Sequence, residues 1–179
     1  MKKGRTAIFA LIFAVLLTLG AAAAEEDAAL IASLTEMDAE AGMPLGEAAG
    51  VDWQETLLLA KAIYACTGNR TFTDEWRLCI GEVVLNRVES PEFPDTLEEV
   101  LRSDKRYSGT TPGYLDAVRP DKKAAEIAVR LMAGERVMGE KKVVWQDCHY
   151  YDGGVYKSLY DYRVGGIFFC LTARPELYE

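Results

Sequence analysis

The spacing of apolar residues changes near Gly134, and this change limits the possible fold class more than any other feature of the chain. Before Gly134, apolar residues recur every three to four positions, as they do on one face of a helix. After it come two short β-type runs, at residues 143–145 and 166–171, with a glycine-rich turn signal at 152–154 between them. The sequence therefore predicts an α+β domain that is mostly helical and ends in a small antiparallel β element.

Four helices are predicted in the part before Gly134. Each begins at a residue that suits a helix start, because its side chain can accept a hydrogen bond from the first turn or because neighbouring acids complement the helix dipole. The predicted starts are Asp52, Thr73, Asp95 and Asp121, and the corresponding ends are Gly68, Glu89, Leu101 and Gly134.

The first 24 residues have the layout of an export signal. Three basic residues precede an uncharged apolar stretch at 6–20, and the small residues Ala21 to Ala24 follow it. The stretch has 15 residues, which is shorter than the roughly 20 that cross a bilayer, and small residues suit signal peptidase. We predict cleavage of residues 1–24 and a secreted or otherwise extracytoplasmic protein with no stable membrane span. An uncleaved membrane anchor is the alternative.

Two segments follow the predicted signal. Residues 25–50 are rich in alanine, glycine and acidic residues, and we expect them to form a tether with one helical stretch around residues 28–39. Residues 51–179 are expected to form the folded domain, and we expect that domain to be a monomer.

The charge of the chain argues against nucleic acid as a partner. The sequence has 20 Lys and Arg against 28 Asp and Glu, a formal net charge of −8. Because the predicted signal contains three basic residues and no acidic ones, the processed chain would carry −11. Phosphate backbones attract clusters of Lys and Arg, so we expect no nucleic-acid binding.

All four cysteines lie after the predicted signal, at Cys66, Cys79, Cys148 and Cys170. An even number of cysteines outside the cytoplasm favours disulfides. Proximity in sequence favours the pairs Cys66–Cys79 and Cys148–Cys170, with the other pairings left open. The chain has no Cys-x-x-Cys pair and only one histidine, His149, so we expect no metal site and no cofactor.

Seven strings of residues occur in a characteristic order. They are LLAKAIYA at 58–65, IGEVVLNRV at 80–88, SPEFPDTLEEVL at 90–101, RYS at 106–108, AGERV at 133–137, VVWQ at 143–146 and GGIFF at 165–169. Together they resemble the SleB-type, spore-cortex-lytic cell wall hydrolase domain over about residues 57–171. The resemblance implies a lysozyme-like α+β fold and a peptidoglycan hydrolase, in many members a lytic transglycosylase, that acts on glycan strands.

The chain departs from this family at the residue that carries the chemistry. The resemblance implies a glutamate just after the first helix, in a Tyr-Ala-Glu-Ala-Gly-like string, which donates a proton to the glycosidic oxygen. The matching string here is YACTG at 64–68, so Cys66 stands at the position of the acid. A thiol with an ordinary pKa near 8.5 is a poor proton donor to an acetal oxygen. Either this chain does not cleave glycan, or another carboxyl group donates the proton to the glycosidic oxygen.

Two carboxylates are weak substitutes for the missing acid. Glu75 lies at a predicted helix start, where the dipole lowers a carboxyl pKa, and a helix-start role explains it. Glu82 lies in the middle of a helix among apolar residues, so it is partly buried or, on the simpler interpretation, solvated at the surface. Cys66 with His149 as its base would suggest a thiol peptidase, although a helix C-terminus opposes a thiolate.

Candidate substrate-binding residues lie in the strings that match the family. They are Tyr64, Arg87, Tyr107 and Trp145. Arg87 could bind a peptide carboxylate, or it could contact backbone carbonyls at the end of its helix. Trp145 belongs to a group of aromatic residues in the β half that could stack on sugar rings or pack in the core; the other members are Tyr150, Tyr151, Tyr156, Tyr160 and Tyr162.

These observations lead to one interpretation and two alternatives. We interpret the chain as an exported cell wall hydrolase family protein directed at glycan strands, with its standard activity lost or altered. The first alternative is a non-catalytic wall-binding or partner-binding module on the same fold. The second is a cysteine-dependent peptidase or amidase that acts on stem peptides.

Overall fold

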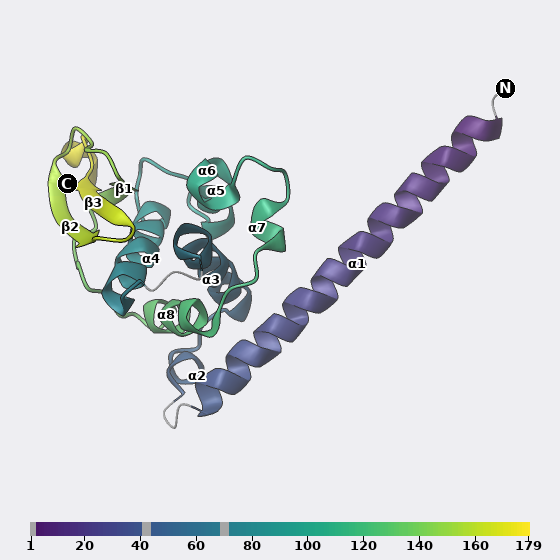
Figure 1. The fold of residues 1–179 in the computed structure, drawn as a ribbon, viewed down its shortest axis with the longest axis horizontal. Helices are drawn as coiled ribbons and strands as arrows, with labels where there is room; N and C mark the ends of the chain where they lie inside the picture. The colour runs from purple at the N-terminus through teal and green to yellow at the C-terminus, as the bar shows by residue number, and fades with distance from the viewer. Residues whose placement is uncertain (1–2, 41–43, 69–71) are drawn as a thin grey trace.

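Three helices form the centre of the fold: α3 (Trp53–Thr67), α4 (Asp74–Val88) and α8 (Lys122–Met132) pack against one another (Figure 1). The computed structural model describes residues 3–40, 44–68 and 72–179, with side chains from residue 21 onward. The short helices α5 (Leu97–Ser103), α6 (Lys105–Ser108) and α7 (Tyr114–Ala117) contact α3. Gly81 marks the point of closest approach between α4 and α8, because a Cβ atom there would overlap the side chain of Leu131.

The C-terminal part forms a three-stranded antiparallel sheet in the order β1-β3-β2. Its strands are β1 (Val143–Asp147), β2 (Val155–Asp161) and β3 (Gly165–Leu171), and the chain ends in a 3-10 turn, η1 (Pro175–Tyr178). Val143 and Phe169 are fully buried and pack with Ile80 and Val83 of α4, so this apolar cluster attaches the sheet to the helices. The predicted α+β class is confirmed, and the two predicted β runs are neighbours in the sheet as β1 and β3. Strand β2 was not predicted.

The predicted helix starts are confirmed at three of the four helices. Asp52 accepts hydrogen bonds from two N–H groups of α3, and Thr73 and Asp121 each accept one from α4 and α8. At α5 the prediction was wrong by one residue. The Thr96 hydroxyl, and not Asp95, accepts the N–H of Glu99 at 3.3 Å.

The expected tether is a packed helix in the structure. Helix α1 (Lys3–Glu40) continues without a break through residues 25–40, and that part contacts α3 and α8. The short helix α2 (Leu45–Ala49) follows, and the Asp38 carboxylate accepts N–H groups at its start. The sequence of α1 explains the packing, because Leu30, Leu34 and Met37 recur at helical spacing and meet Leu57 and Ala125. None of the described helices has the length and apolar character that a membrane span requires.

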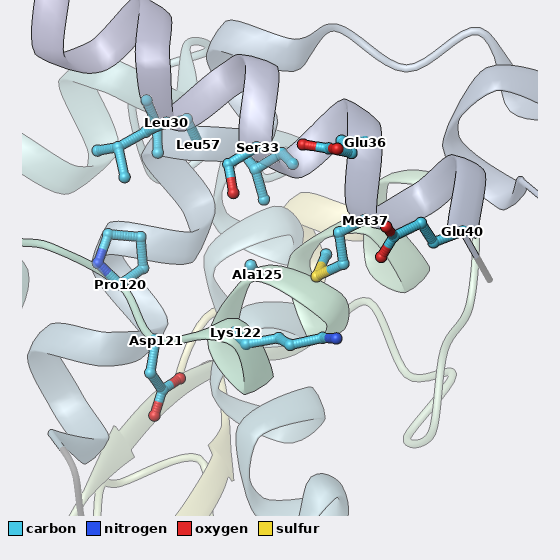
Figure 2. A pocket seen from close by; sticks show the side chains of 11 residues that line it. Leu30, Ser33, Glu36, Met37, Glu40, Leu57, Pro120, Asp121, Lys122 and Ala125 are labelled. Atoms are coloured by element: carbon cyan, nitrogen blue, oxygen red, sulfur yellow. The ribbon is translucent and has the colours of Figure 1, made fainter.

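A pocket of about 360 Å³ lies between α1 and the start of α8 (Figure 2). Leu30, Leu34 and Met37 line it from α1, and Pro120 and Lys122 line it from the other side. None of the candidate catalytic or substrate-binding residues named from the sequence borders this pocket. We therefore assign this pocket to imperfect packing between α1 and α8, and we place the candidate site elsewhere.

The packing of α1 predicts that Asp27→Asn destabilises the protein by about 1–3 kcal/mol. Lys61 is only 3% exposed, and its Nζ lies 2.7 Å from Asp27 Oδ1. The change replaces the carboxylate with a neutral carboxamide, so the buried ammonium, which also donates to the carbonyl oxygen of Asp116 at 3.3 Å, loses its compensating negative charge. Urea denaturation measures the change. Glu36→Gln, at an exposed residue of α1, is the control and should stay within about 0.5 kcal/mol. Equal, negligible effects of both changes would favour the tether.

Candidate functional site

A cleft of about 390 Å³ lies where the C-terminal end of α3 meets α4, α6 and the sheet. Ala65 and Cys66 line it from α3, Trp76 and Ile80 from α4, and Arg106 from α6. Gln146 and Asp147 of β1, and Cys148 directly after this strand, contribute the rest of the polar lining. The position that the resemblance implies for the acid therefore does border a cleft.

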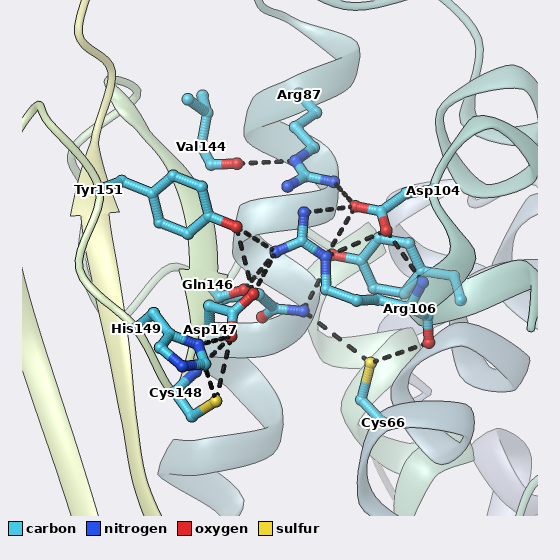
Figure 3. Close-up of polar contacts among 11 residues, drawn as sticks. Cys66, Arg87, Asp104, Arg106, Val144, Gln146, Asp147, Cys148, His149 and Tyr151 are labelled. Atoms are coloured by element: carbon cyan, nitrogen blue, oxygen red, sulfur yellow. Dashed lines mark hydrogen bonds and ion pairs between the residues drawn. The ribbon is translucent and has the colours of Figure 1, made fainter.

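Cys66 keeps part of its surface open to this cleft, but protein atoms surround its sulfur (Figure 3). The thiol donates to the carbonyl oxygen of Arg106 and accepts from the Gln146 side-chain amide, both at 3.9 Å. Burial, helped by the negative charge of Asp104, raises the pKa of the Cys66 thiol to about 12. At neutral pH this group holds its proton, and it acts neither as a general acid nor as a thiolate nucleophile.

Gln146 connects Cys66 to Tyr107. Its side-chain amide donates to the Tyr107 hydroxyl at 2.9 Å. Gln146 is only 2% exposed, and its Oε1 has no hydrogen-bond partner within the described parts of the chain. A buried carbonyl oxygen without a donor is costly. Gln146 lines the cleft, but this atom has less than 1 Å² of exposed surface, so a ligand would reach it only after a rotation of the side chain.

Arg106 is held in place by two carboxylates and a backbone carbonyl. Its Nε donates to both oxygens of Asp104 at 3.0 Å. Its Nη1 donates to Asp147 Oδ2 at 3.3 Å and to the backbone carbonyl oxygen of Gln146 at 2.6 Å. Burial raises the pKa of Asp104, but hydrogen bonds from Arg106 and Arg87 outweigh that effect, and the pKa is lowered overall. Asp104 therefore stays ionised, and it serves to position the two guanidinium groups.

The side chain of Arg87 joins α4 to the sheet. It is 1% exposed; its Nε donates to the carbonyl oxygen of Val144 at 2.7 Å and its Nη1 pairs with Asp104 at 2.7 Å. Asn86, beside it, donates to the carbonyl oxygens of Glu140 and Val143. Arg87 therefore contacts a backbone carbonyl of strand β1 and a carboxylate, and not the carbonyls at the end of its own helix that one interpretation of the sequence expected.

The other candidate substrate-binding residues differ in how open they are. Tyr107 is fully buried, whereas Tyr64 and Trp145 are half-buried. Trp145 stacks on Tyr151 with ring centroids 4.8 Å apart. The remaining tyrosines of the aromatic group named from the sequence are exposed, and they are Tyr150, Tyr156, Tyr160 and Tyr162.

Neither Glu75 nor Glu82 lines the cleft. Glu75 is exposed and pairs with Lys157 at 2.6 Å. Glu82 is fully buried, so the expectation of a solvated side chain was wrong. Its carboxylate accepts the backbone N–H groups of residues 137, 138 and 139 at 2.7 to 2.9 Å, and it thereby anchors the loop that precedes the sheet.

Asp147 is the carboxylate that lines the cleft. Its oxygens accept hydrogen bonds from Cys148, Tyr151 and Arg106 and lie next to His149. Burial raises the pKa of Asp147, but the hydrogen bonds from Cys148, His149 and Tyr151 outweigh that effect and lower the pKa overall. Asp147 is therefore an ionised acceptor and does not hold a proton for donation.

The two predicted disulfides are absent from the structure, in which all four cysteines are described and carry free thiols. The strand register explains one case, because Cys170 lies opposite Trp145 and Val155 and is buried, whereas Cys148 follows β1 and is exposed. Cys66 contacts Arg106 and Gln146, while Cys79 is enclosed in the apolar cluster between α4 and the sheet.

His149 lies beside Cys148, at 3.2 Å from its sulfur, and not beside Cys66 as the thiol-peptidase hypothesis requires. Asp147, Cys148 and His149 form a cluster of three residues whose side chains could bind a metal ion, and this cluster was not predicted from the sequence. The fact that the three residues are consecutive in the sequence could have indicated the cluster.

The comparisons with known proteins found one match. A family model described as cell wall hydrolase matches residues 73–162. No curated protein and no solved structure matches the chain. The matched segment runs from the start of α4 through β2, so it contains Arg106, Gln146 and Asp147 but begins after Cys66.

Proposed function

This chain belongs to the cell wall hydrolase family, and from that membership we propose that it is an exported protein that binds the glycan strands of peptidoglycan without cleaving them. The proposal combines the family's substrate with a cleft that has lost the group for its standard reaction.

One observation carries the proposal: among the described residues that line the cleft, none has a group suited to protonate a glycosidic oxygen. That step needs a carboxyl group that keeps its proton near the working pH, which burial among apolar residues provides in glycosidases. Cys66 has a thiol with a pKa of about 12, and a thiol is a poor donor to an acetal oxygen. Asp147 has a lowered pKa and is already ionised.

Other features of the cleft support binding. Its volume of about 390 Å³ lies within the usual range of ligand sites. The Gln146 Oε1 atom is buried and lacks a donor from the described residues. Amino sugars carry hydroxyl and acetamido N–H groups, and either can donate to such an oxygen. A rotation of the Gln146 side chain toward the cleft, which this residue lines, would let a glycan strand donate to the atom that the fold leaves unpaired.

A stem-peptide hydrolase that uses Cys66 has less support. A cysteine nucleophile works as a thiolate and needs a lowered pKa, whereas burial raises the pKa of Cys66. The neighbours of its sulfur are a carbonyl oxygen and an amide, and neither is a base.

The proposal predicts that the purified protein co-sediments with insoluble peptidoglycan and releases no muropeptides above the buffer background. Gln146→Met should weaken the binding roughly fivefold, the equivalent of one net hydrogen bond, while Gln54→Met on the exposed side of α3 leaves it unchanged. Sedimentation and mass spectrometry of the supernatant measure the two properties. Muropeptide release by the native protein would refute the loss of activity, and failure to sediment would refute the binding.

A further inference from the structure

Three consecutive residues bring three different donor atoms together at the edge of the cleft. They are Asp147 at the end of β1, Cys148 and His149 (Figure 3). We propose that these residues bind one divalent metal ion of the Zn²⁺ class through a carboxylate oxygen, a thiolate sulfur and an imidazole nitrogen. The inference is independent of glycan binding, because it rests on these three side chains and their supports.

The distances between the donor atoms suit a tetrahedral ion. Cys148 Sγ lies 3.2 Å from Asp147 Oδ1 and 3.2 Å from His149 Nδ1, and the two latter atoms are 3.3 Å apart. Ligands at the usual zinc distances of 2.0–2.3 Å are separated by roughly 3.3–3.6 Å in a tetrahedron. The three atoms therefore need to move apart by only a few tenths of an ångström to hold the ion.

The arrangement differs from that of a nucleophilic cysteine. In a Cys-His-Asp triad, the thiol contacts one imidazole nitrogen and the carboxylate orients the ring through the other. Here the Cys148 sulfur and the Asp147 oxygen both lie next to the same nitrogen, His149 Nδ1. Donor atoms that converge on one point are typical of ligands around an ion.

The carboxylate ligand is oriented by its own neighbours. Asp147 Oδ2 accepts a hydrogen bond from the Tyr151 hydroxyl at 3.1 Å and one from Arg106 Nη1 at 3.3 Å. These contacts hold the second oxygen and leave Oδ1 facing Cys148 and His149. Outer-shell hydrogen bonds of this kind fix ligating groups in established metal sites.

The donor set selects the class of ion. Thiolate and imidazole ligands suit Zn²⁺ and related transition metals, whereas Mg²⁺ and Ca²⁺ prefer oxygen ligands alone. Three protein ligands leave a tetrahedral ion with one open position, as in catalytic zinc sites. Because Asp147 and Cys148 also line the cleft, that position is available to water or to a group of a molecule bound there.

Metal titration of the reduced full-length protein tests the site. We expect one Zn²⁺ per chain by calorimetry, and Co²⁺ should give a thiolate-to-cobalt charge-transfer band with the intense visible absorption of four-coordinate cobalt. Cys148→Ser and His149→Gln should each weaken binding by more than about 100-fold, beyond the 10–100-fold cost of losing an outer-shell contact. Tyr151→Phe should cost about tenfold.

Cys66→Ser is the matched control, because it removes a thiol from the same cleft that is not among the three ligands. It should retain both the stoichiometry and the charge-transfer band. Cys148 and His149 are exposed, so circular dichroism of their variants should match the native protein. The proposal is overturned by absence of binding, by binding that survives Cys148→Ser, or by loss of the band in Cys66→Ser. Metal-independent cleavage of stem peptides that disappears in Cys148→Ser would also overturn it and assign a nucleophile instead.

Discussion

Replacing Cys66 with glutamate is expected to give the protein glycan-cleaving activity. The substitution returns a carboxyl group to the position where the family resemblance implies one, at the end of α3 and on the cleft. General acid catalysis contributes about 10²–10⁴-fold. We therefore expect Cys66→Glu to release muropeptides from purified peptidoglycan at a rate above the buffer background, to which the native protein is limited, by about this factor.

The surroundings of Cys66 favour a protonated carboxyl. Burial is the largest influence on the thiol and raises its pKa, and the charge of Asp104 acts in the same direction, while Arg106 and Arg87 oppose them. A carboxyl group at the same place experiences the same directions, because both groups are neutral when protonated and negative when ionised. Its pKa is thus raised, and activity should fall as the pH increases through that raised value.

Cys66→Gln is the matched control, since it has nearly the same shape as the glutamate variant but carries no proton for donation. It should remain as inactive as the native protein, and thermal unfolding should show that both variants are folded. A folded and inactive Cys66→Glu protein would contradict the idea that this one group is what the cleft lacks.

Glu82→Ala is expected to destabilise the fold by about 4 kcal/mol. The carboxylate of Glu82 is fully buried and accepts three backbone N–H groups from residues 137–139. Its removal leaves the N–H of Met138 buried without this acceptor, removes the acceptor of the more exposed residues Val137 and Gly139, and detaches from α4 the loop that leads into β1. A loss of this size is a large fraction of the 5–15 kcal/mol that stabilises a typical domain.

Urea denaturation of Glu82→Ala beside Glu75→Ala separates anchoring from the loss of a charge on α4. Glu75 is exposed and paired with Lys157, so its removal should cost no more than about 1 kcal/mol. Glu82→Gln keeps one carboxamide oxygen as an acceptor and should lie between the two. Equal midpoints for Glu82→Ala and Glu75→Ala would show that the loop does not depend on this carboxylate.

The features that the sequence predicted well are local ones. Asp52, Thr73 and Asp121 were identified as helix starts because a cap acts on N–H groups two or three residues away. The runs that became β1 and β3 carry buried, β-type residues on a short stretch. Strand β2 was not predicted, because its residues are exposed or half-buried and its sequence therefore lacks the apolar pattern of a core strand.

The features that were missed depend on distant partners. Glu82 is buried because three N–H groups some 55 residues later converge on it. The packing of residues 25–40 depends on Leu57 and Lys61, which lie on another helix. The disulfide prediction assumed that cysteines near in sequence are near in space, whereas the register of β1 and β3 separates Cys148 from Cys170. Cys66 was correctly expected at a helix C-terminus, while its contacts with Arg106 and Gln146 required the tertiary fold.

The unbroken course of α1 gives the predicted export processing a structural consequence. Glu25, Glu26 and Asp27 lie in the middle of this helix, where their charges gain nothing from its dipole. Cleavage after Ala24 would turn the same three acids into the first turn of a shorter helix, next to its positive end and to the new terminal ammonium group, where their negative charges are favourable. Glu26 and Asp27 would keep their ion pairs with Arg119 and Lys61. Removal of the leader would thus leave a shorter α1 that begins with acidic residues and is already packed against the domain. The cleavage that matures the protein would therefore also stabilise this helix.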